Sequence, residues 1–97
     1  GPAVVSIDNL KDPLDLEIQS HVNGERMQHS HTRFLIHPVP RLVAYLSERV
    51  TLRPGDLIFT GTPSGVGSVR DPRIFLKPGD VIRSEIEELG VLENRCV

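Results

Sequence analysis

Apolar and polar residues alternate over residues 14–22. This two-residue period is typical of a strand with one buried face. Asn23-Gly24 follows directly and is the strongest short signal for a two-residue hairpin turn, usually of type I′. The returning strand is predicted over residues 25–30, and its polar sequence indicates a sheet edge.

The period lengthens from Val39, where apolar residues recur on one helical face up to about residue 50. Pro38 and Pro40 suit the first turn of such a helix, because the N–H that proline lacks has no helical partner there. Near the start of the chain, the β-branched run over residues 3–7 predicts a short buried strand.

A short segment occurs twice, as residues 52–58 and 76–82, and each copy is a Pro-Gly-Asp turn followed by apolar residues. Residues 81–89 alternate in polarity, Gly90 interrupts them, and residues 91–97 form a last strand. Together these elements predict a mixed, β-rich α+β fold with one main helix, of the roll or barrel type; a solenoid needs more repeats.

The apolar run Leu57–Phe59 predicts a buried strand that ends in the glycine-rich segment Thr60–Gly67. Glycines allow positive φ and close backbone approach, and two threonines add hydroxyls. Such a loop suits a small oxygen-rich ligand, a carboxylate or phosphate. Glycines that only relieve a steric conflict explain the pattern equally well. A nucleotide-binding loop is disfavoured, because no Lys-Ser/Thr pair follows the glycines.

The composition sets outer bounds on function. The 97 residues make one domain at most, and a net charge of −2 argues against nucleic-acid binding. No apolar run approaches the length of a membrane span.

Cys96 is the single cysteine and cannot form an internal disulfide, which indicates a reducing, cytoplasmic environment. A position in the sheet suits Cys96 better than a nucleophilic role. Gly1-Pro2 is either the start of a fragment processed from a longer chain or a remnant of a cloning tag.

Two groups of polar residues are weaker candidates for chemistry. His29 and His31 share a strand face, but no cysteine or carboxylate completes a recognisable metal-ligand set, so solvated or hydrogen-bonded histidines are favoured. Glu85 and Glu87 also share a face and could act as an acid and base pair. Unpaired exposed carboxylates usually face solvent, which is the preferred interpretation.

The order and spacing of several motifs resemble the C-terminal half of the fumarylacetoacetate hydrolase family. The matching residues include Val22-Asn23-Gly24-Glu25, Gln28, Thr32, Val50-Thr51-Leu52, Pro54-Gly55-Asp56-Leu57-Ile58-Phe59-Thr60-Gly61-Thr62-Pro63, Gly65-Val66-Gly67, Phe75-Leu76-Lys77-Pro78-Gly79-Asp80 and Glu85-Ile86-Glu87. They run nearly from end to end of the chain. Phe34-Leu35-Ile36 and His37 depart from the family pattern in a packing segment.

The resemblance implies that residues 1–97 are the C-terminal portion of a β-roll catalytic domain, usually a homodimer, whose N-terminal metal-binding half is absent here. It implies a hydrolase, decarboxylase or isomerase that uses Mg²⁺, or Mn²⁺ or Ca²⁺, and acts on 1,3-dicarbonyl or 2-oxo acids through a metal-stabilised enolate. Acylpyruvate, fumarylacetoacetate and oxaloacetate are substrates of this type. The choice of substrate and reaction stays open, and the isolated chain is expected to be inactive.

By the same resemblance, Thr62 contacts substrate, Gly61 and Thr60 support it, and Gln28 is structural within the hairpin. The family's metal ligands and its catalytic histidine, glutamate and lysine lie upstream of the matching region. We therefore expect no catalytic residue and no metal ligand in this chain, and Glu85-Ile86-Glu87 is not given the metal role. The alternative is a non-catalytic β-roll module that is structural or binds a small anion.

Overall fold

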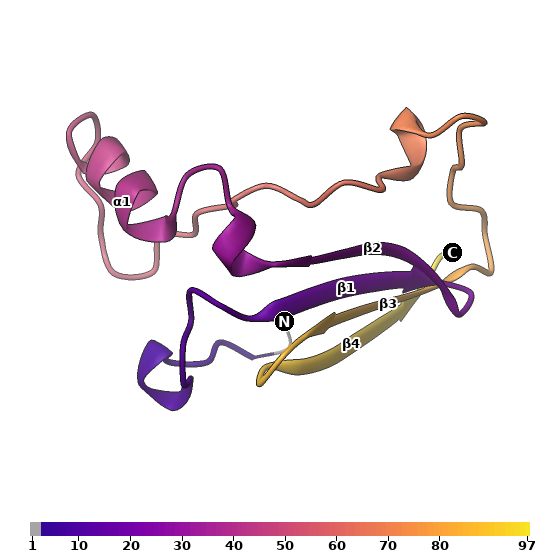
Figure 1. Cartoon of the computed structure of the whole chain (residues 1–97), viewed down its shortest axis with the longest axis horizontal. Coiled ribbons are helices and arrows are strands. Elements are labelled where there is room, and N and C mark those ends of the chain that lie inside the picture. The colour runs from indigo at the N-terminus through magenta and orange to yellow at the C-terminus, as the bar shows by residue number, and fades with distance from the viewer. Residues whose placement is uncertain (1–2) are drawn as a thin grey trace.

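Within residues 3–97, which the computed structural model describes, four strands form one antiparallel sheet (Figure 1). They are β1 (Glu17–Val22), β2 (Glu25–His31), β3 (Val81–Ile86) and β4 (Gly90–Arg95), in the order β2-β1-β3-β4. β1 pairs with β2 on one side and with β3 on the other, so distant parts of the chain meet in the sheet. The predicted β-rich α+β fold is confirmed, and β2 lies at an edge as its polar sequence indicated. Gly1-Pro2 lies outside the described residues.

The hairpin turn at Asn23-Gly24 is confirmed. Both residues have positive φ, 50° and 83°, as a type I′ turn requires. The Asn23 side chain also holds the turn against the start of β3. Its amide donates to Asp80 Oδ1 at 2.8 Å, and its carbonyl oxygen accepts from the Val81 N–H at 2.9 Å. One residue therefore closes the hairpin and helps to set the register between β1 and β3.

The turns of the two repeated segments have the same local structure, but only the second turn leads into a strand. In each turn the aspartate accepts from the N–H three residues before it, Asp56 from Arg53 at 2.7 Å and Asp80 from Lys77 at 2.8 Å. The pKa of the Asp80 carboxyl lies below its ordinary value of 3.8, because the Asn23 amide and then the Lys77 N–H donate to the carboxylate. Asp80 therefore favours its charged form in the folded chain.

Two predicted strands are wrong for the described residues. Residues 3–6 have no regular structure and lead into a 3₁₀ turn, η1 (Ile7–Asn9), and Val4 is 94% exposed. Leu57–Phe59 is irregular rather than a buried strand, with Leu57 79% and Phe59 94% exposed. The N–H groups of residues 57–62 donate to no backbone carbonyl within residues 3–97. An apolar run forms a strand only when a neighbouring strand supplies hydrogen-bond partners, and no described strand does so here.

The predicted helix is α1 (Val39–Ser47), preceded by Pro38. Its last turn extends to Val50, whose N–H donates to the Leu46 carbonyl at 2.9 Å. It lies at one end of the molecule, beyond the end of β2 (Figure 1). No helix in the described part of the chain has the length and apolar character needed to cross a membrane.

Leu16 is the one buried apolar side chain within residues 3–97, at 5% exposure. Its N–H donates to Thr32 Oγ1 and its carbonyl accepts from the Thr32 N–H, both at 2.9 Å, which ties the entry of β1 to the end of β2. Half-buried Cys96 continues the β3–β4 pairing through its N–H, which donates to the Asp80 carbonyl at 2.8 Å. Cys96 itself lies one residue beyond β4, which ends at Arg95, so the predicted sheet position is not confirmed, although its backbone bonds to the residue before β3. Most apolar side chains outside this small core remain open to solvent.

Candidate substrate groove

The glycine-rich segment lies along edge strand β2. Figure 1 shows the long irregular connection from α1 running beside this strand to the 3₁₀ turn η3 (Gly67–Val69). An open groove of about 530 Å³ separates residues 60–64 from the turn η2 (Thr32–Phe34) and the start of α1. Its apolar lining includes Ile18, Phe34, Leu35, Ile36 and Leu42.

The three residues predicted to bind substrate, Thr60, Gly61 and Thr62, all line this groove and all are exposed. Gly61 has a φ of 100°, so a positive-φ turn does occur between the two threonines. Within residues 3–97 the N–H groups of these three residues have no backbone acceptor. Donors therefore lie at one side of a groove whose other side combines apolar side chains with polar ones such as His31 and His37, an arrangement suited to a small molecule with an oxygen-rich end.

Two side chains attach the segment to the sheet. Gln28, on β2, donates through Nε2 to Thr62 Oγ1 at 2.8 Å and to the Pro63 carbonyl at 2.7 Å. Arg70 donates to the Gly65 carbonyl at 3.0 Å and to the Met27 carbonyl at 2.6 Å. The sequence placed Gln28 within the hairpin, and nothing in local periodicity indicated a partner 34 residues away.

Close contacts with backbone carbonyl groups explain why two positions of the segment are glycine. A Cβ on Gly65, whose φ is 106°, would lie 2.1 Å from the Met27 carbonyl oxygen. A Cβ on Gly67 would lie 2.2 Å from the Ile74 carbonyl oxygen. Gly61 differs, because no atom lies within 4 Å of its added Cβ. The two interpretations of the loop thus apply to different residues: Gly65 and Gly67 allow close packing, while Gly61 lies open at the groove.

The histidines of β2 contact carboxylates. His29 Nε2 lies 2.6 Å from Glu17 Oε1, and His31 Nδ1 lies 3.3 Å from Asp15 Oδ1. The hydrogen-bonded state expected for these histidines is confirmed for His29. No cluster of three or more His, Cys, Asp or Glu side chains able to hold a metal occurs within residues 3–97. The residues described here therefore do not fit a metal centre, and we derive no chemical step through a metal from them.

Glu85 and Glu87 do not form an acid and base pair. Glu85 Oε2 accepts from Arg83 at 3.1 Å, whereas Glu87 lies beyond the end of β3 and accepts from the Glu17 N–H at 3.1 Å. The strand face that they were predicted to share ends at Ile86. Both carboxylates serve local hydrogen bonds.

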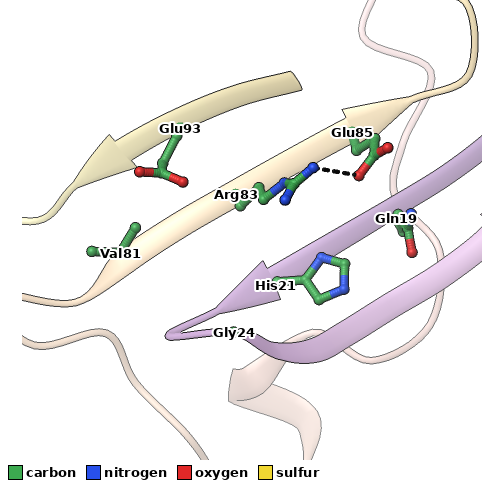
Figure 2. Close-up of a pocket in the computed structure, with 7 residues that line it drawn as sticks. All are labelled: Gln19, His21, Gly24, Val81, Arg83, Glu85 and Glu93. Atoms are coloured by element: carbon green, nitrogen blue, oxygen red, sulfur yellow. Dashed lines mark hydrogen bonds and ion pairs between the residues drawn. The ribbon is translucent and has the colours of Figure 1, made fainter. Parts of the chain in front are cut away.

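A second, polar hollow of about 450 Å³ lies on the sheet face opposite the groove. Gln19 of β1 lines the hollow and its neighbour Ile18 lines the groove, and successive strand residues point to opposite faces. Figure 2 shows Arg83 directed at Glu85, with His21 and Glu93 on the neighbouring strands. The hollow is thus lined by one arginine, one histidine and two carboxylates, and Arg83 already pairs with Glu85.

Comparison with known proteins agrees with this fold. The family model described as fumarylacetoacetate (FAA) hydrolase C-terminal matches residues 1–97. Oxaloacetate tautomerase FAHD2B, mitochondrial, of Bos taurus is 50% identical over 97 residues, which are 100% of this chain and 31% of the relative. A Mycobacterium smegmatis crystal structure superposes with a TM-score of 0.96 at 55% identity, over 100% of this chain and 36% of that one.

Maleylpyruvate hydrolase from Sphingobium sp. SYK-6, solved in complex with manganese(II) and pyruvate, superposes with a TM-score of 0.89 at 36% identity, over 100% of this chain and 34% of that one. The chain thus belongs to the fumarylacetoacetate hydrolase family and corresponds to its C-terminal region. It spans about a third of the length of the relatives that it matches.

Proposed function

We propose that this chain is the C-terminal part of a fumarylacetoacetate hydrolase-type catalytic domain that acts on small 2-oxo acids. Acids of the oxaloacetate type are the leading substrate class, and keto–enol isomerisation is the leading reaction. The support is the 50% identity to proteins named oxaloacetate tautomerase. The more distant relative named maleylpyruvate hydrolase, solved with pyruvate, supports the wider class of 2-oxo acids.

The observation that carries this proposal is the shared groove of Thr60, Gly61 and Thr62. Their hydroxyl and N–H groups supply donors for a carboxylate or carbonyl oxygen, and the apolar side chains among the residues opposite them accommodate a short carbon skeleton. Keto–enol conversion builds negative charge on the carbonyl oxygen, and donors held in place before the reaction stabilise that charge. The role proposed for this chain is to hold and orient the oxygen-rich end of the substrate.

The large exposed apolar surface supports the view that these residues are one part of a larger domain. Side chains such as Phe34, Leu57 and Phe59 are exposed by 65%, 79% and 94%. A self-contained domain rarely leaves so many large apolar side chains open to water. We propose that protein outside this chain covers it. That other part would also supply the ligands for a divalent ion, since the described residues hold no metal cluster. The homodimer implied by the family resemblance stays a prediction.

The test is Thr62→Val in the full-length protein that contains this chain, with oxaloacetate as substrate and the enol absorbance as the signal. Loss of one hydrogen bond to a charged group corresponds to about 1.5–3 kcal/mol, so kcat/KM is expected to fall about 10-fold to 150-fold. Thr51→Val is the matched control, because Thr51 is exposed and does not line the groove. Equal activity of both variants would remove Thr62 from the site.

A further inference from the structure

Gln28 connects three parts of the molecule through one amide group. Its Oε1 accepts from Ser20 Oγ on the neighbouring strand β1 at 3.1 Å. Its Nε2 donates to the Pro63 carbonyl at 2.7 Å and to Thr62 Oγ1 at 2.8 Å. The amide is part-buried between β2 and the glycine-rich segment.

The chemistry of these partners determines which way the amide faces. A backbone carbonyl can only accept, so the amide nitrogen must face Pro63. The amide oxygen then faces Ser20, whose hydroxyl can donate. A flipped amide would place its oxygen against the Pro63 carbonyl oxygen, two acceptors at 2.7 Å, with no hydrogen between them.

This orientation decides the role of the Thr62 hydroxyl. The amide nitrogen has two hydrogens, one for the Pro63 carbonyl and one for Thr62 Oγ1. Thr62 must therefore accept from Gln28, and its own hydroxyl hydrogen stays available. Within residues 3–97, Gln28 is the side chain that hydrogen-bonds to this hydroxyl, and Thr62 lines the groove. The hydrogen can thus be donated to a ligand.

We propose that Gln28 is a positioning residue that holds the Thr62 hydroxyl as a hydrogen-bond donor toward the groove. The groove then selects ligand groups that accept, such as a carboxylate or an enolate oxygen, over groups that donate. This inference rests on the proposed function, because it concerns the same groove. It adds a residue outside the groove lining, acting through Thr62, and a defined direction for one hydrogen bond.

Arg70 provides a comparison, because it attaches the same segment without touching Thr62. Its guanidinium joins the Gly65 and Met27 carbonyls at 3.0 and 2.6 Å. Weakening this attachment changes the placement of the segment but leaves the donor and acceptor roles at Thr62 as they are. Arg70→Lys is therefore the control for a general loss of anchoring.

The decisive variant is Gln28→Glu in the full-length protein. A carboxylate has nearly the same shape as the amide but can only accept. It therefore loses the hydrogen bond to the Pro63 carbonyl, and the Thr62 hydroxyl would turn to donate to it and would present lone pairs to the groove. We expect the KM for oxaloacetate and the dissociation constant for pyruvate to rise about 10-fold to 100-fold, with a smaller change in kcat. Arg70→Lys is expected to change both constants less than about threefold.

Coupling separates this role from a merely structural one. If Gln28 acts through the Thr62 hydroxyl, Gln28→Glu should add little once Thr62→Val has removed that hydroxyl. Fully additive effects of the two substitutions would overturn the proposal, as would a Gln28→Glu protein with unchanged pyruvate affinity. If Gln28→Glu does not fold, Gln28→Met replaces it, because Met has a similar length without the polar groups. The proposal then requires that Gln28→Met and Thr62→Val are not additive.

The same set of variants distinguishes this inference from the proposed function. A Thr62→Val protein with normal kinetics would contradict the function proposed for the groove. A Thr62→Val protein with weakened binding, combined with additive Gln28 effects, would leave that function in place and remove the role of Gln28.

Discussion

Gly65→Ala is the substitution for which the structure predicts the largest local effect. The added Cβ would lie 2.1 Å from the Met27 carbonyl oxygen and 3.2 Å from its carbonyl carbon. Both are backbone atoms of an edge strand and cannot rotate away as a side chain can. Arg70 also holds this carbonyl, through a 2.6 Å hydrogen bond. Relief of the clash therefore requires the segment to move away from β2.

Two contributions determine how far Gly65→Ala lowers the free energy of unfolding. A non-glycine residue at a φ of 106° costs about 1–3 kcal/mol in backbone strain. Moving the segment away from β2 disrupts a hydrogen bond from a charged group, which corresponds to a further 1.5–3 kcal/mol or so. The sum is roughly 2.5–6 kcal/mol, a large part of the 5–15 kcal/mol or so that stabilises an ordinary protein.

Denaturant unfolding of the full-length protein measures this loss, and the chain offers a matched control. Gly61→Ala places Ala at nearly the same φ, 100°, but its Cβ meets no atom within 4 Å. It should lose only the strain contribution of about 1–3 kcal/mol. Equal destabilisation by the two substitutions would refute the reasoning, because the contact with Met27 would then have no measurable cost.

Two further predictions concern the acid end of the stability profile and the isolated chain. Because hydrogen bonds lower the Asp80 pKa, the stability that they contribute is present above the ordinary value of 3.8 and is lost as the pH falls through the lowered folded-state pKa. Asp80→Asn should therefore lower the melting temperature more near about pH 6 than near about pH 3, and an equal difference at both pH values would contradict this role. The isolated 97-residue chain should bind a hydrophobic dye and should not turn over oxaloacetate or acetylpyruvate with Mg²⁺; measurable turnover by the pure chain would show that the site is complete without further protein.

Local sequence rules predicted the elements whose causes are local. The hairpin at Asn23-Gly24 follows from two residues that tolerate positive φ, and helix α1 follows from its apolar periodicity after Pro38. The repeated turns at Asp56 and Asp80 follow from Pro-Gly-Asp chemistry, which needs only four residues. Each of these predictions depended on neighbours a few positions apart, and each is confirmed.

Predictions that needed a distant partner were less successful. Leu57–Phe59 has the composition of a buried strand, but a strand also needs a neighbour, and no described strand pairs with it. Glu85 and Glu87 were predicted to share a strand face, but β3 ends at Ile86 and the Glu17 N–H at the start of β1 bonds to Glu87.

The sequence by itself determined the hairpin, the helix, the repeated turns, the family and the small donors at Thr60–Thr62. Only the tertiary structure showed that Gln28 holds the Thr62 hydroxyl and that Gly65 lies against Met27, since these contacts join residues 34 or more positions apart. The physical reason is that hydrogen-bond direction and steric contact depend on which atoms meet. That meeting is decided by the pairing of β1 with β2 and the return of the chain along β2, which no local pattern specifies.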